Sequence, residues 1–334
     1  MAVSEHPFAQ YVRILGKGRN GSRSFSHQEA RDVMRMIMAD EVTPEQLGAV
    51  LMLMRVKEET PEEVAGFAEA IKDSLDLPKD LPDVMVDWSS YAGKRRHLPW
   101  YLLSALLLAE NGISIFIHGA SGHTAGRLYT KDVLGLLGLS QATSLQTAAS
   151  QLRDNNFSYI DLEHLSPRLH HIIELRPLLG LRSPVHTVAR LLNPFSASHV
   201  ITSIHHPGYH PIHQQASRLL GHQHAAVVKG EGGEIERNPD MACLVKTLHG
   251  DVMTDEEWPA MFKRRHVKPK SLEPSELVAV WRGEQDNEYG VAAITGTAAI
   301  ILKTLGRANT MEEAEKIATN MWQARSREKV PAAA

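Results

Sequence analysis

The first 78 residues place hydrophobic and polar positions with the period of an α-helix. Apolar residues recur three or four positions apart, as at Leu47, Val50, Leu51 and Met54, so they share one helical face. FAQYVRIL reads as a short amphipathic helix capped by Gly16, and Ser26 begins SHQE, a capping box. Two further helices open at the segments Thr43-Pro44-Glu45 and Thr60-Pro61-Glu62-Glu63. The pattern predicts a small helical domain over residues 1–78.

The hydrophobic pattern changes after the linker DLPKDLPD. Apolar runs that fit β-strands (VMVDW, ISIFIHG, SHVITSIHH and HAAVVKG) alternate with helices such as LPWYLLSALLLAENG and PIHQQASRLLG. This alternation predicts a large α/β domain over residues 83–334, with a mainly parallel sheet. Two mid-chain helices at about 165–192 are expected to join the helical domain, TMEEAEKIATNMWQAR to form a capped amphipathic helix, and residues 254–274 to form an exposed loop.

Composition narrows the function classes. The 334 residues include one cysteine, Cys243, and no apolar run long enough to span a bilayer, so we expect a cytoplasmic protein that does not bind membranes. The net charge of −3 argues against a uniformly basic nucleic-acid binder. The charge is uneven, however: residues 40–87 are acidic, whereas residues 13–35 and 94–190 are net basic.

The stretch DWSSYAGKRRHLPW, residues 87–100, follows the first predicted strand. Loops in this place bind ligands in α/β sheets. Two interpretations are open: the loop cradles a substrate's phosphates, or Lys94, Arg95 and Arg96 grip a phosphate backbone.

Three other segments carry candidate anion contacts. GKGRNG, residues 16–21, matches G-x-G-x-x-G but lacks a preceding strand, so we interpret it as a flexible basic loop. HGASGHTAGR, residues 118–127, is either an anion site before a helix or an ordinary strand-to-helix turn. FKRRHVKPK, residues 262–270, is a second basic patch or a solvated loop.

The sequence contains two groups of residues that could be considered as metal ligands. Glu231, Glu234 and Glu236 follow a predicted strand and could hold Mg²⁺, which prefers hard oxygen ligands. His205, His206, His210 and His213 cluster without framing carboxylates or cysteines. We expect no functional metal site.

The order of these segments resembles the anthranilate phosphoribosyltransferase fold family, which is glycosyltransferase family 3-like. The resemblance rests on TPEQLGAVLMLMRVKEETPEE, the HG after the second strand, GLRSPVHTVARLLNPFSA, SIHHPGY and HAAVVKGEGGE. It implies a class-III-like phosphoribosyltransferase fold, in which a small helical domain usually forms the dimer contact beside a large α/β domain.

The sequence departs from the family where its chemistry takes place. Members carry a TGGDG-type loop after the first strand, whereas this chain has Trp88, Tyr91 and only Gly93 in DWSSYAGKRR. Their KHGNR becomes IHGAS, and their paired Asp-Glu metal ligands become Ile235-Glu236. The family positions that this sequence retains are His118, Gly119, Arg176 and Glu236.

The departures resemble a YbiB-type branch whose members bind DNA and RNA without evident sequence preference. SYAGKRR matches that branch's SYxGxRK, GKGRN its N-terminal loop, and residues 206–209 its HPxY. The resemblance implies a homodimeric DNA- or RNA-binding protein without catalysis or cofactor. The predicted contacts are Lys17, Arg19, Arg23, Tyr91, Lys94, Arg95, Arg96, Arg127, Lys263, Arg264 and Arg265, with Trp88 as an alternative stacking residue and Lys268 and Lys270 as extensions.

Two alternatives stay open at this point. The chain could be an active phosphoribosyltransferase of unknown acceptor, with Arg176 on the acceptor and Glu236 on Mg²⁺. It could also be a scaffold that binds another protein through its acidic helical domain, although no motif supports that function.

Overall fold

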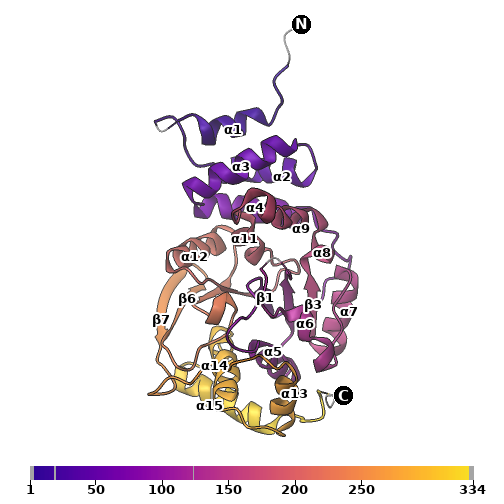
Figure 1. Cartoon of the computed structure of the whole chain (residues 1–334), viewed down its shortest axis with the longest axis vertical. Helices are drawn as coiled ribbons and strands as arrows, with labels where there is room; N and C mark the ends of the chain where they lie inside the picture. Colours follow the sequence, from indigo (N-terminus) through magenta and orange to yellow (C-terminus); the bar gives the residue numbers. More distant parts are fainter. Residues whose placement is uncertain (1–3, 19, 123, 331–334) are drawn as a thin grey trace.

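The computed structural model describes residues 4–18, 20–122 and 124–330. Four helices form one end of the molecule (Figure 1): α1 (Ala9–Gly16), α2 (His27–Met38), α3 (Pro44–Lys57) and α4 (Pro61–Asp73). Ser26, Thr43 and Thr60 each complete a capping box at the start of α2, α3 and α4. The predicted helices are confirmed, except that Lys17, not Gly16, is the C-cap of α1.

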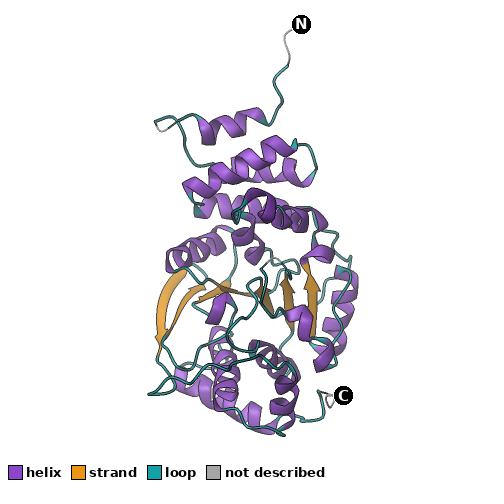
Figure 2. Ribbon diagram, in the orientation of Figure 1, coloured by secondary structure: helices purple, strands orange, loops and turns teal. Residues whose placement is uncertain are grey.

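A seven-stranded sheet forms the centre of the α/β part (Figure 2), in the order β3-β2-β1-β4-β5-β6-β7. The first five strands are parallel, and β6 and β7 are antiparallel to their neighbours. The strands are β1 (Val86–Ser90), β2 (Ile115–Gly119), β3 (Phe157–Asp161), β4 (His199–Ser203), β5 (His224–Val228), β6 (Cys243–His249) and β7 (Val252–Trp258). The prediction of a mainly parallel sheet is confirmed.

The expectation of a loop from residue 254 onward is wrong for residues 254–258, which belong to β7. This edge strand reads VMTDEEW, and only Trp258 at its end is buried. Because this strand carries charged residues along an exposed edge, it lacks the alternation of apolar and polar residues by which a strand is predicted. Such charges also discourage pairing with the edge strands of other chains.

Helices cover both faces of the sheet and create two cores. Alternate residues of β2 point to opposite faces: Ile115 and Ile117 belong to one core, and Phe116 to the other. The first core is formed with α5 (Tyr101–Glu110), α13 (Ser275–Arg282), α14 (Glu288–Thr304) and α15 (Met311–Ala324). The second contains α7 (Leu145–Asn155), α9 (Pro167–Glu174), α11 (Val185–Val188), α12 (His210–Leu219) and the N-terminal helices.

The helical end packs directly onto this second core, because α4 contacts both α11 and α12. The remaining short helices are α6 (Thr130–Val133), α8 (Leu162–Leu165) and α10 (Arg176–Leu179). No helix among residues 4–18, 20–122 and 124–330 is both long and apolar enough to cross a membrane.

The strand order positions a cleft. The chain moves from β1 outward through β2 and β3, and then returns to β4 on the other side of β1. Ligands bind at such a switch point, beyond the carboxyl ends of the parallel strands. The loops that follow β1, β2, β4 and β5 leave the sheet at this edge.

Candidate functional site

The loop after β1 is fastened to the loop after β2. The backbone of Lys94 donates to and accepts from that of Leu128, at 2.7 and 2.8 Å. Gly93 has φ +66°, and a Cβ there would lie 2.8 Å from Cε1 of Tyr129. A side chain at position 93 would therefore be both strained and obstructed. The loop is a packed element of the cleft wall.

A buried carboxylate fills the anion-binding position of this loop. The backbone N–H groups of Ala92 and Gly93 both donate to Oε1 of Glu234, each at 2.6 Å. Successive N–H groups that converge in this way form a nest for an anion. Burial raises the pKa of Glu234, while Arg190 and the two N–H groups act in the opposite direction. The nest is thus occupied by the chain's own side chain.

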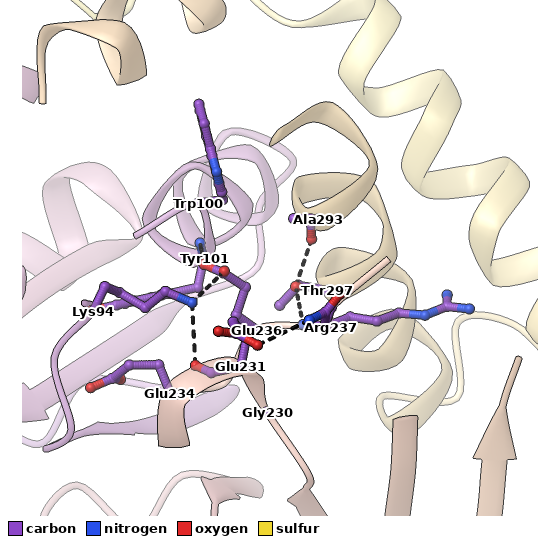
Figure 3. Close-up of polar contacts among 12 residues, drawn as sticks. Lys94, Trp100, Tyr101, Gly230, Glu231, Glu234, Glu236, Arg237, Ala293 and Thr297 are labelled. Atoms are coloured by element: carbon purple, nitrogen blue, oxygen red, sulfur yellow. Dashed lines mark hydrogen bonds and ion pairs between the residues drawn. The ribbon is translucent and has the colours of Figure 1, made fainter. Parts of the chain in front are cut away.

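Lys94 forms an internal ion pair and does not lie at the mouth of the cleft (Figure 3). Its Nζ lies 2.6 Å from Oε1 of Glu236 and 3.2 Å from the carbonyl oxygen of Glu231. The other oxygen of Glu236 accepts from the backbone N–H of Tyr101, at 2.9 Å. Lys94 and Glu236 are 1% and 0% exposed. The prediction that Lys94 contacts phosphate is therefore wrong for this conformation, because Glu236 holds its ammonium group in the interior.

Tyr91 and Trp88 are also buried, so the prediction that either stacks on a base from solvent is wrong. Tyr91 pairs through its hydroxyl with Nδ1 of His118 at 2.7 Å, and Nε2 of His118 lies 3.1 Å from Asp87. Trp88 points to the opposite face of the sheet and packs against Tyr101. The retained family position His118 therefore belongs to a buried polar chain between strands β1 and β2.

The three carboxylates after β5 do not fit a Mg²⁺ ion. Glu234 and Glu236 already accept from N–H groups or an ammonium, and Oε2 of Glu231 accepts from the side chain of Asn238 at 3.0 Å. A cation would have to replace Lys94 and expel these donors. Within the described part of the chain, no group of three or more His, Cys, Asp or Glu residues is arranged to hold a metal.

Four arginines lie close together beside the loops after β1, β2 and β5; we call Arg127, Arg176, Arg182 and Arg190 the arginine cluster. Arg127 donates to the carbonyl oxygens of Ala92 and Gly93, at 2.9 and 3.1 Å. Arg176 and Arg182 both donate to the hydroxyl of Thr124, and the guanidinium of Arg190 lies 5.8 Å from the ring centre of Tyr91.

The arginine cluster holds an excess of positive charge, of which Glu234 offsets a part at Arg190. Among the described residues, Arg127, Arg182 and Arg190 form no ion pair with a carboxylate; their contacts are carbonyls, a hydroxyl and a ring. Burial, and then the charges of Arg176 and Arg127, lower the pKa of Arg182. Like charges held together in a partly desolvated cleft favour an anionic ligand.

Sequence reasoning missed Arg182 and Arg190, although a signal was present. The chain contains no Asp or Glu between Glu174 and Glu231. Both arginines fall in this stretch, so they have no acidic sequence neighbours. The convergence with Arg127 comes from the fold.

The other predicted basic contacts lie in three places. Arg95 and Arg96 are exposed beside the cleft, and Lys263, Arg264 and Arg265 are exposed in the loop after β7. Lys17 and Arg23 are exposed at the helical end, far along the long axis from β1 (Figure 1), and Arg23 pairs with Glu29 at 2.6 and 2.7 Å. Arg19 lies outside the described residues. Within one chain, the loop of Lys17 and Arg23 therefore does not join the arginine cluster.

The helical end, the order of the sheet and the position of the cleft define an anthranilate phosphoribosyltransferase-like scaffold. Residues 12–75 match the helical bundle domain of a glycosyl transferase family, and residues 93–324 match its a/b domain. The chain belongs to this glycosyl transferase family.

Individual relatives agree with this assignment. An uncharacterized protein of Aquifex aeolicus is 29% identical over 320 residues, covering 94% of this chain and 97% of its own. Anthranilate phosphoribosyltransferase of Ralstonia pickettii is 28% identical, covering 75% and 74%, and the uncharacterized protein YbiB of Escherichia coli is 27% identical, covering 74% and 78%. The crystal structure of anthranilate phosphoribosyltransferase from Thermus thermophilus has the same fold, with a TM-score of 0.77, 20% identity and coverage of 93% and 94%.

Proposed function

We propose that this protein binds DNA or RNA without sequence preference, through basic residues around the cleft, and has no transferase activity. The observation that carries the proposal is the arginine cluster, in which Arg127, Arg182 and Arg190 form no ion pair among the described residues. Arg95 and Arg96 extend the positive surface outward, since both side chains are exposed.

The chemistry of the cluster suits a phosphate backbone. A guanidinium presents donors in a planar fork that matches phosphate oxygens, and it stays charged even when partly buried. Contacts of this kind add affinity and salt dependence but read no base sequence.

The filled nest argues against a phosphoribosyl donor in the same place. Such a donor carries a diphosphate, which would compete with Glu234 for the N–H groups of Ala92 and Gly93. It would also meet no Mg²⁺ site of the usual kind, because Glu236 is neutralised by Lys94. The yeast anthranilate phosphoribosyltransferase, which has been solved in complex with PRPP and Mg, shares only the fold with this chain, at 20% identity and a TM-score of 0.75.

We further propose that two copies form a homodimer through the helical end. Large apolar side chains are exposed there and nearby: Val56 on α3 is 83% exposed, Leu178 on α10 is 83% exposed and Leu181 is 53% exposed. Exposed apolar groups of this size often mark protein interfaces. A two-fold dimer would present each basic surface twice and lengthen the path for a nucleic acid.

A salt titration tests the proposal. A fluorescent single-stranded oligonucleotide is titrated with wild-type protein at several salt concentrations, beside the double variant Arg95→Ala, Arg96→Ala and the single variant Arg182→Gln. We expect steep weakening with salt in the wild type, because each phosphate contact contributes about 0.7 to the slope of log K against log salt. Losing two contacts lowers that slope by about 1.4.

The control is the double variant Arg218→Ala, Arg307→Ala, which removes the same charge. Arg218 pairs with Asp251 beyond the amino end of β5, and Arg307 is exposed after α14. We expect this control to keep the wild-type slope. If the wild type does not bind at low salt, or if the control variant loses as much slope as the Arg95 and Arg96 variant, the proposed interface is wrong.

A further inference from the structure

Two members of the arginine cluster share a single oxygen atom. Arg176 and Arg182 both donate to the hydroxyl oxygen of Thr124, at 2.8 and 3.4 Å. Arg182 also lies close enough to Arg127 and Arg190 to interact with the charge of each. A hydroxyl is neutral, so it does not offset the repulsion between the cations that it brings together. An anion beside Thr124 would offset that repulsion.

The other two members of the arginine cluster lie against one turn. Arg127 and Arg190 donate to two consecutive carbonyl oxygens of the turn at residues 231–233, each at 3.4 Å. Glu234 offsets part of the charge of Arg190. Among the described residues, no carboxylate pairs with Arg127 or Arg182. At least two positive charges of the cluster are therefore held together without an acidic partner.

Solvent reaches the arginine cluster. The side chain of Arg182 is exposed, and the other three arginines are half-buried. Gly122 and Gly126 lie on either side of Thr124, and Gly180 precedes Arg182 by two residues. A Cβ added at any of these glycines would meet no heavy atom of the described residues within 4 Å. A ligand can therefore approach from solvent and contact guanidinium groups that have already lost part of their hydration.

We infer that the arginine cluster binds the terminal phosphate of a nucleic-acid strand, a phosphate monoester, more tightly than an internal phosphate. This inference rests on the proposed function. A monoester carries nearly two negative charges at pH 7 and three acceptor oxygens, whereas each phosphate inside a strand carries one charge. The double charge matches the two arginines without an acidic partner, and the planar forks of several guanidinium groups match the additional oxygen.

The test compares single strands of one sequence that carry a fluorescent label on an internal base. They have a 5′-phosphate, a 3′-phosphate, or hydroxyls at both ends, and each end phosphate is also supplied as its methyl ester, which keeps the phosphorus but only one negative charge. For the wild type we expect one phosphate-ended strand to bind about 10-fold more tightly than the hydroxyl-ended strand, the effect of one further charge-assisted hydrogen bond. Its methyl ester should lose most of that gain.

Two variants separate recognition of the end from attraction to the strand. Arg182→Gln removes an exposed cation of the cluster, so it should bind phosphate-ended and hydroxyl-ended strands with equal affinity. Arg95→Ala, Arg96→Ala is the matched control: it should weaken the binding of both strands and keep the ratio of their affinities. A free nucleoside 5′-monophosphate is added as competitor, and it should displace the phosphate-ended strand only in large excess, because it makes no contacts along a backbone.

The outcomes distinguish this inference from the proposed function. If the wild type binds phosphate-ended and hydroxyl-ended strands equally, or if Arg182→Gln keeps the full ratio of affinities, the inference is wrong and the proposed function stands. If the free monophosphate displaces the strand at equal concentration, the ligand is a free nucleotide and the strand-end inference is wrong. If no strand binds the wild type at low salt, the proposed function fails and this inference fails with it.

Discussion

Variants of the buried pair Lys94 and Glu236 distinguish a structural role of the loop after β1 from a role in binding. The two side chains meet at 2.6 Å and are 1% and 0% exposed. Removing one partner of such a pair leaves a buried charge without compensation, which costs about 3–5 kcal/mol. Lys94→Met should therefore lower the free energy of unfolding by about that amount at pH 8.5, above the pKa of about 7 that Glu236 has beside Lys94.

The free energy of unfolding that Lys94→Met loses relative to the wild type should increase as the pH rises. Burial raises the pKa of Glu236 to about 7, while Lys94 opposes that rise. Without Lys94 the pKa moves higher, so the folded variant holds a proton that the unfolded chain releases at its ordinary value of about 4.3. An acid with a raised folded pKa contributes stability below its unfolded pKa and loses it as pH rises through the folded pKa. As the pH rises, the difference in free energy of unfolding between the wild type and Lys94→Met should grow by at most about 1.4 kcal/mol per pH unit.

The double variant Lys94→Met, Glu236→Gln is the matched control. Glutamine keeps an acceptor for the N–H of Tyr101 and removes the buried charge, so most of the lost stability should return. Urea denaturation at pH 6 and pH 8.5 measures both variants, and the salt slope of strand binding is measured on the double variant. At pH 8.5, a loss below about 1 kcal/mol in Lys94→Met or no recovery in the double variant would refute an internal role for Lys94. A salt slope lowered by about 0.7 in the double variant would refute it as well.

Two further predictions concern acid stability and assembly. Both ring nitrogens of His213 are buried without a partner, and desolvation lowers its pKa to about 3. Because the unfolded chain takes up a proton near pH 6.5, stability is lost as pH falls from there towards 3. Lowering the pH from 7.5 to 5 should thus cost the wild type about 2 kcal/mol more than His213→Leu in urea denaturation, and equal losses would contradict this. In sedimentation equilibrium, the wild type should have the mass of a dimer and Val56→Asp, Leu178→Asp that of a monomer, whereas a monomeric wild type would remove the proposed interface.

The helical end could be predicted closely because its signals are local. Ser26, Thr43 and Thr60 indicate where three helices start, because each forms capping-box hydrogen bonds with the residue three positions later. Strands β1, β2, β4 and β5 were equally visible as apolar runs. Strand β3, FSYID, is as long as these four strands, but Ser158 and Asp161 interrupt its apolar run, and β7 has charged residues along an open edge. In both, the partner strand supplies the stability that the local pattern does not show.

The cleft could be predicted only as a region. SYAGKRR correctly marks the loop after β1, but the direction of each side chain depends on a long-range contact. Lys94, whose backbone pairs with that of Leu128, has a buried side chain, whereas the side chains of the next two residues, Arg95 and Arg96, are exposed. Likewise, the absence of acids between Glu174 and Glu231 indicates positive charge, but the hydroxyl of Thr124 that gathers Arg176 and Arg182 lies about 50 residues earlier in the chain.

The placement of acids explains how a protein of net charge −3 can present a positive cleft. Near the cleft, the carboxylates of Glu234 and Glu236 are buried against N–H groups and Lys94, so they contribute little to the field outside. Arg176, Arg182 and Arg190 lie within residues 175–230, which contain no Asp or Glu, whereas most of the acidic residues of 40–87 belong to α3, α4 and the segment that leads to β1. Such separation lets attraction reach about one Debye length, roughly 8 Å at physiological salt. A site that holds one diphosphate through direct contacts does not need attraction over this distance. A long polyanion does gain from it, because each of its phosphates is attracted.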